Sequence, residues 1–176
     1  MASSYRRAVA SPFERDQGTQ SDRINSAFDS SAVTQIMRYL LVFLALAGVV
    51  ISIMALRIHY STATEPCSIN DHWDCGIVNH SSYSEIAHIP VAAVGIVGYL
   101  LLGILAFARR RILLAIFAMI GCAFALHLSS IEHSVLQVWC LYCVISQGII
   151  ALITLLGIAW VIASEVSKAR TRKAAA

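Results

Sequence analysis

Charged residues are scarce in this chain, and positive charge is absent from long parts of it. Asp, Glu, Lys and Arg make up 13% of the 176 residues, about half the share found in an average soluble domain. No Lys or Arg occurs from Ile58 to Ala108 or from Ile112 to Ser167. Such stretches cannot form the surface of a soluble domain, so a soluble globular protein is excluded. No internal repeat and no second domain are evident.

Four apolar segments occupy the stretches from which charge is missing: Tyr39–Leu56, Ile89–Ala108, Ile112–Ser130 and Ser134–Ser164. A bilayer core is crossed by roughly 20 apolar residues. The pattern therefore predicts an all-α integral membrane protein with a four-transmembrane-helix bundle. The last segment exceeds the required length, so it must tilt or begin above the membrane surface.

Twelve of the thirteen Lys and Arg residues fall on one side of such a bundle, and only Arg57 falls on the other. Because positive residues favour the cytoplasmic side, we expect both termini in the cytoplasm and residues 58–88 outside it. The net charge of +3 then reflects topology rather than nucleic-acid binding.

The chain is expected to divide into a membrane domain and two tails. Residues 1–35 are rich in Ser, Arg, Asp and Gln and lack helical periodicity, so we expect a disordered cytoplasmic tail. Residues 36–165 form the membrane domain, and residues 166–176 form a basic cytoplasmic tail. No cleavable signal peptide is evident, because the first apolar segment starts late and is long enough to be a signal anchor.

Four of the five cysteines form two pairs on the outer side of this topology. Cys67 and Cys75 lie in the outer loop, whose Pro, Gly, Ser, Asp and Asn content is typical of a flexible arm. Cys140 and Cys143 form a C-x-x-C motif early in the fourth apolar segment. Cys122 lies alone in the third segment and is typical of a small buried apolar residue.

The two pairs differ in depth, and therefore in the chemistry open to them. Cysteines at i and i+3 share a helix face, and the helix N-terminus favours a thiolate. A C-x-x-C in the bilayer can meet a lipid-soluble oxidant, whereas a loop pair can meet a protein thiol. Such a chain can move two electrons from a protein dithiol to a quinone. Taken alone, each pair also fits a structural role, as a loop disulfide or as core cysteines.

The ordered set of these residues resembles the vitamin K epoxide reductase family in its bacterial form. The resemblance rests on "CSINDHWDC", on Ser81 six residues later, on a second span beginning "HIPVAAVGIVGY" and on the C-x-x-C motif, and it covers roughly residues 36–165. It implies a four-helix bundle in the bacterial inner membrane. A cysteine-bearing extracytoplasmic loop, often with a short half-helix, would lie over a quinone site.

The resemblance also implies roles for individual residues. Cys67 exchanges with the protein partner, Cys75 passes the electrons to Cys140, and Cys143 lies nearest the quinone, which we expect to be ubiquinone or menaquinone. Further candidates for contact with the quinone are a loop serine and the aromatic neighbours of the C-x-x-C motif, namely Ser81, Trp139 and Tyr142. From sequence, the two aromatic residues could equally be interfacial anchors.

The chain differs from animal members of the family at two positions linked to binding of vitamin K and its epoxide. Gln147 stands where those members carry Tyr, and "IPVAAVG" lacks their Asn. Reduction of vitamin K or its epoxide is therefore an alternative that we favour less than reduction of a plain quinone. We expect no fused thioredoxin-like domain after "SKARTRKAAA", so the expected partner is a separate periplasmic, DsbA-like protein of the thioredoxin fold.

Several polar residues surround the turn between the third and fourth segments: His127, Glu132, His133 and Gln137. Any of them could donate a hydrogen bond or a proton to a quinone. We expect Glu132 and His133 to face water or headgroups instead. His127 lies deeper, where a functional role and a helix-packing role fit equally well.

Two other functional interpretations involve the same cysteines. A membrane metal-binding or transport protein could bind zinc or copper through a Cys/His cluster that includes His72 and His80. Its spacing, C-x4-H-x2-C-x4-H, matches no ligand pattern that we recognise, so no metal site is predicted. A DsbB-like oxidase also has four spans, but both of its cysteine pairs lie in or beside outer loops. The second pair of this chain lies in the fourth apolar segment, which disfavours that interpretation.

Overall fold

The computed structural model describes residues 12–61, 67 and 72–175, and these are almost entirely helical. The elements in chain order are α2 (Pro12–Tyr60), α3 (Cys75–Asn79), the 3-10 turn η1 (Ser82–Ser84), β1 (Glu85–Ile86), β2 (Ile89–Pro90), α4 (Val91–Phe107), α5 (Arg111–Ile131), the π-helical turn η2 (Glu132–Leu136) and α6 (Leu141–Ala175). The chain divides into two units, Met1–Ile36 and Met37–Ala176. The second unit holds all five cysteines.

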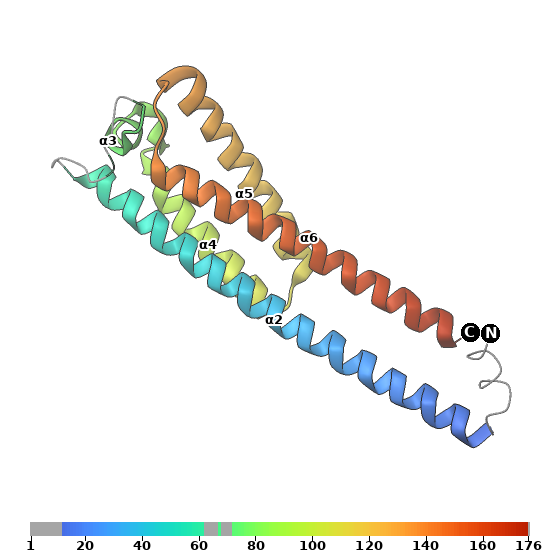
Figure 1. The fold of residues 1–176 in the computed structure, drawn as a ribbon. Helices are drawn as coiled ribbons and strands as arrows, with labels where there is room; N and C mark the ends of the chain where they lie inside the picture. The colour runs from blue at the N-terminus through green and yellow to red at the C-terminus, as the bar shows by residue number, and fades with distance from the viewer. Residues whose placement is uncertain (1–11, 62–66, 68–71, 176) are drawn as a thin grey trace. The chain divides into compact units, whose positions relative to one another are not determined.

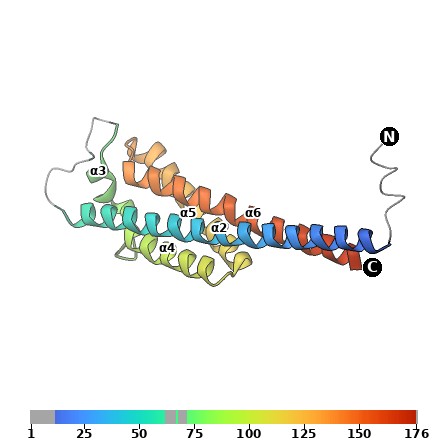
Figure 2. The ribbon, with the colours of Figure 1, turned by 60° about the horizontal axis from the view of Figure 1, so that its bottom comes forward.

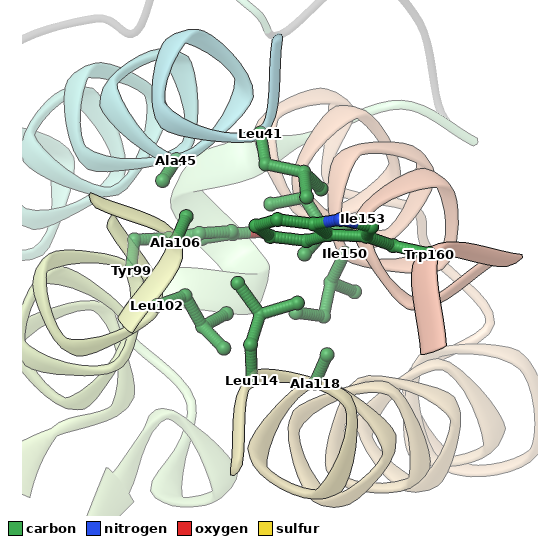
Figure 3. Close-up of a cluster of buried hydrophobic side chains, with 10 residues drawn as sticks. All are labelled: Leu41, Ala45, Tyr99, Leu102, Ala106, Leu114, Ala118, Ile150, Ile153 and Trp160. Atoms are coloured by element: carbon green, nitrogen blue, oxygen red, sulfur yellow. The ribbon is translucent and has the colours of Figure 1, made fainter. Parts of the chain in front are cut away.

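In the second unit, α2 from Met37 onward packs with α4, α5 and α6 as a helical bundle (Figures 1 and 2). The most extensive contact is between α5 and α6. Every one of these helices contributes side chains to one buried cluster (Figure 3), whose members are Leu41, Ala45, Tyr99, Leu102, Ala106, Leu114, Ala118, Ile150, Ile153 and Trp160. Cys122 packs against this cluster, as expected for an apolar packing residue.

Two glycines allow the helices to approach each other closely. A Cβ atom added at Gly48 of α2 would collide with the ring of Tyr99 on α4. One added at Gly157 of α6 would lie 2.7 Å from the Leu114 side chain on α5. Small residues at helix contacts are typical of membrane bundles, in which close packing rather than the hydrophobic effect holds helices together.

Three stretches of helix in the described part of the chain are long and apolar enough to cross a membrane: Ala32–Tyr60, Arg111–Leu136 and Leu141–Lys173. The remaining large helix, α4, is apolar but only 17 residues long. The expected all-α architecture is therefore confirmed.

Two boundaries differ from expectation. Residues 12–35, expected to lack regular structure, belong to α2, because a helix nucleated in an apolar segment extends at little further cost. The fourth helix begins at Leu141 rather than Ser134. Gln137 interrupts it, since its backbone is left-handed, with φ 55° and ψ 21°. Residues 1–11 of the expected tail lie outside the described residues.

Candidate functional site

A short backbone bridge joins the outer loop to the segment that leads into α6. Trp73 and Trp139 pair in parallel. The Asp74 N–H donates to the Trp139 carbonyl at 3.1 Å, and the Trp139 N–H donates to the His72 carbonyl at 2.9 Å. Trp73 lies two residues before Cys75, and Trp139 lies directly before Cys140. The bridge therefore brings together two redox motifs that are about 65 residues apart in the chain.

Helix α3 fixes the loop cysteine at its first residue. The Asp74 carboxylate accepts a hydrogen bond from the Ile77 N–H at 3.0 Å and caps the helix. Cys75 follows directly and is bonded to Cys67 in a disulfide, with Cα atoms 5.8 Å apart. Helix α3 is five residues long and carries one end of the disulfide.

The loop disulfide and the C-x-x-C motif share one buried cluster. Figure 1 shows α3, which begins with Cys75, at one end of the bundle. Cys67, Cys75 and Cys140 are 3%, 0% and 0% exposed, and Cys143 packs against them. The structure therefore brings all four predicted cysteines together. Cys140 and Cys143 are free thiols here.

The Cys140 sulfur accepts hydrogen bonds from several donors. The Cys143 N–H lies 3.4 Å from it, and the side-chain amide of Asn79 lies 3.5 Å from it. The pKa of the Cys140 thiol is lowered, mainly by a hydrogen bond from the Cys143 side chain and to a smaller extent by the one from Asn79. Burial acts in the opposite direction. Cys140 precedes α6 and lies outside the long apolar helices. This arrangement favours a thiolate at Cys140.

Asn79 was not recognised from the sequence, yet it connects the two redox pairs. It is 6% exposed. Its side-chain amide donates to the Cys75 carbonyl at 2.8 Å as well as to the Cys140 sulfur. Only its distance of four residues from Cys75 could have indicated a role, because that spacing places both on one helix face.

Replacing Asn79 with alanine is expected to make Cys140 less reactive. The Cys140 pKa should rise, because the variant loses a hydrogen bond that stabilises the thiolate. Alkylation of Cys140 in the reduced protein should then need a higher pH, as site-resolved mass spectrometry would show. An unchanged pH profile would mean that Asn79 only braces α3.

Glu132 corrects one expectation, because it does not face water. It is 4% exposed, and its carboxylate accepts a hydrogen bond from the Cys140 N–H at 3.3 Å. The π-helical turn η2 directs it inward, whereas His133 and Gln137 nearby are exposed. His127 on α5 is also exposed.

A cavity of about 490 Å³ opens beside Cys143 and is lined mainly by apolar residues of α2, α4, α5 and α6. Two predicted quinone contacts, Ser81 and Tyr142, line it together with Cys143. Trp139, the third, does not line it and lies in the backbone bridge instead. Gln147 lines the cavity and accepts a hydrogen bond from Ser129.

Two further residues give this cavity polar groups that sequence reasoning missed. The Tyr99 hydroxyl donates to the Ser146 carbonyl at 2.7 Å. His59 Nδ1 lies 2.6 Å from the Asn79 carbonyl, and its Nε2 lies 3.3 Å from the Glu85 carboxylate. Both Tyr99 and His59 are in the cavity lining. A mainly apolar cavity with a few polar groups is typical of a site for an amphipathic small molecule.

The alternative metal site finds no support among the described residues. No group of three His, Cys, Asp or Glu side chains there could hold a metal ion. The ring nitrogens of His80 lie 2.9 Å from the Gly76 carbonyl and 3.1 Å from the Ser61 carbonyl. Cys67 and Cys75 are bonded to each other.

A bundle of apolar helices, with a disulfide packed against a second cysteine pair that borders an apolar cavity, defines a membrane oxidoreductase. A comparison with known protein families matches residues 39–160 to the vitamin K epoxide reductase family. Because the match covers most of the chain, the protein belongs to that family, as the resemblance predicted. No curated protein matches the chain.

Proposed function

We propose that the protein oxidises the dithiol of a separate thioredoxin-fold partner, of DsbA-like chemistry, and reduces a quinone, so that it supports disulfide-bond formation. One observation carries this proposal. The C-x-x-C motif has two different surroundings, because Cys140 is packed with the loop disulfide while Cys143 borders the apolar cavity. A motif placed in this way can receive electrons from one direction and release them in the other.

The chain's own residues supply a sequence of balanced exchanges. A partner thiolate attacks the Cys67 sulfur of the loop disulfide, and Cys75 leaves as a thiolate. Cys75 attacks Cys140 when that residue is bonded to Cys143, and Cys143 leaves. The partner and the loop pair close their own disulfides in turn, so two electrons and two protons come to rest on the C-x-x-C dithiol. Their transfer to the acceptor restores the Cys140–Cys143 disulfide.

The cavity fits a quinone in size and character. Pockets for small molecules typically measure about 300–1,000 Å³ and combine apolar walls with a few polar groups. The Tyr142 side chain is the candidate to donate to a carbonyl oxygen, and the apolar walls would hold an isoprenoid chain. Ser81 borders the same space, but its hydroxyl donates to the Val78 carbonyl at 2.8 Å, so it would donate to a quinone only after releasing that bond. Ubiquinone and menaquinone both meet these requirements, and a bound quinone would supply a two-electron acceptor beside Cys143.

The decisive experiment follows both ends of the reaction in purified protein. A reduced partner of the thioredoxin fold and a short-chain quinone are mixed with the protein, and thiol loss and quinone absorbance are recorded together. Equal consumption of dithiol and quinone is expected, and alanine at any of the four paired cysteines should abolish it. Dithiol oxidation without quinone reduction would refute the proposal.

We also propose that four helices span the bacterial inner membrane, with both termini in the cytoplasm. Single reporter cysteines at Ser82 and Ser167, in a background without native cysteines, test this. A membrane-impermeant thiol reagent added to spheroplasts is expected to label the Ser82 position and not the Ser167 position, although both residues are exposed in the structure. Labelling of the Ser167 position in intact spheroplasts would overturn the topology.

A further inference from the structure

Glu132 is an acidic residue placed where acidic residues are unfavourable. It is the only Asp or Glu between Ile86 and Ser164. It is 4% exposed and belongs to a helical stretch that is apolar enough to cross a membrane. Burying a carboxylate costs several kcal/mol unless it has partners, and such groups inside membrane proteins mark functional sites.

The backbone around Glu132 departs from regular helix. Residues Glu132–Leu136 form a π-helical turn, and Gln137 ends it in the left-handed conformation. Within the turn Glu132 is buried, whereas His133, Ser134 and Val135 are exposed. Wide turns of this kind are rare and occur frequently at functional sites. This one holds a single polar side chain inside the protein.

The carboxylate lies beside both members of the C-x-x-C pair. One oxygen accepts the Cys140 N–H at 3.3 Å, and the side chain is close enough to the Cys143 side chain to interact with it. Glu132 and Cys143 both line the apolar cavity. The carboxylate therefore lies between the reacting sulfur and the space into which its electrons are proposed to leave.

We propose that Glu132 is a catalytic acid–base residue that accepts the thiol proton of Cys143 and passes it to the reduced acceptor. The role rests on the proposed quinone reduction. The Cys140–Cys143 dithiol loses two electrons and two protons as its S–S bond forms, and the quinone gains both to become a hydroquinone. Glu132 carries the Cys143 proton to one quinone oxygen. The other oxygen takes a proton from water, which replaces the one that Cys140 gave up when its thiol ionised. At the end of the step Glu132 is again a carboxylate.

Other titratable groups near the cavity are less well placed. Among the described residues, Cys140 and Cys143 are the titratable residues that interact with the carboxylate, Cys140 through its backbone N–H. His133 on the same turn is exposed. His59 shares the cavity lining, but its ring nitrogens are directed at the Asn79 carbonyl and at Glu85. Tyr142 also lines the cavity, where its proposed role is to donate to a quinone carbonyl.

The first test is a single-turnover measurement with Glu132→Gln, which keeps the shape and an oxygen that can accept the Cys140 N–H. The reduced protein is mixed with a short-chain quinone across a range of pH. At neutral pH the variant should be about a hundredfold slower, because general acid–base catalysis contributes about 10²- to 10⁴-fold. The difference should shrink at high pH, where hydroxide can remove the proton. An unchanged rate, or the same loss at every pH, would overturn the role. Glu132→Asp should recover part of the rate.

A second readout needs no quinone. A carboxylate disfavours another negative charge beside it, so Glu132→Gln should speed alkylation of Cys143 in the fully reduced protein, while Cys122 in the same sample reacts as before. Unchanged Cys143 reactivity would overturn the proposal, and so would faster reaction of both cysteines, which would indicate a loosened fold. If the wild type fails to reduce any quinone, the proposed function fails, yet this readout still decides whether Glu132 acts on Cys143.

The matched control is Glu165→Gln, the same substitution on an exposed carboxylate of α6. Its side chain pairs with Lys168 at 2.7 Å. At about 1.5 Å per residue, it lies roughly 33 Å along the helix from Cys143. Both readouts should match the wild type. A loss equal to that of Glu132→Gln would show that the effect is one of overall charge and would overturn the assignment.

Discussion

Replacing Cys143 with alanine is expected to stop turnover and to accumulate a disulfide between Cys75 and Cys140. In this variant Cys140 cannot close its own disulfide. Its thiolate can still attack the Cys75 sulfur, and Cys67 then leaves as a thiolate. The reaction is favoured because Cys75 and Cys140 are both fully buried in one cluster. Asn79 also holds the Cys75 carbonyl and the Cys140 sulfur through one amide group.

The trapped species can be identified by digesting the protein under non-reducing conditions and sequencing the linked peptides by mass spectrometry. A link between Cys67 and Cys140 alone would reverse the order proposed for the loop cysteines. Cys122→Ala is the control, because Cys122 packs against the bundle core rather than the cysteine cluster. It should keep turnover close to the wild-type rate, and a large loss would show that Cys122 has a role beyond packing.

The sequence was sufficient to predict the family and to single out the two cysteine pairs, because the features that identify them are local. The spacing of Cys140 and Cys143, the loop pair and the long apolar segments all follow from residues near one another in the chain. The third apolar segment, Ile112–Ser130, also matches α5 within one residue at each end. These features depend on propensity and composition, which a single sequence records.

The contacts that assemble the site are non-local, and the sequence carried no sign of them. Nothing in "VWC" indicates that Trp139 pairs with Trp73. The apolar pattern continues through residues 134–140, so the π-helical turn and the late start of α6 were missed. Glu132 shows the consequence most clearly. A lone acid beside a loop usually faces water, and only the wide turn reveals that this one is buried against Cys140.

Blocking the cavity should separate the two halves of the reaction. Gly98 on α4 lines the cavity, and a Cβ atom added there meets nothing within 4 Å. Phenylalanine at this position is therefore expected to occupy the cavity without displacing the helices. Quinone reduction should fall by about a hundredfold, since losing roughly 3 kcal/mol of binding has that effect. Exchange between a small dithiol and the loop disulfide should stay close to the wild-type rate.

Gly148→Phe on α6 is the matched control. A Cβ atom at Gly148 also meets nothing within 4 Å, but this glycine is absent from the cavity lining. Both glycines are exposed helical residues, so the two substitutions change helix propensity and surface hydrophobicity alike.

Quinone kinetics and dithiol exchange are measured for both variants in the same lipid. If Gly98→Phe keeps full quinone activity, the acceptor binds elsewhere. If both variants lose activity equally, the cause is the added bulk on the bundle surface. Loss confined to Gly98→Phe would locate the acceptor beside Cys143.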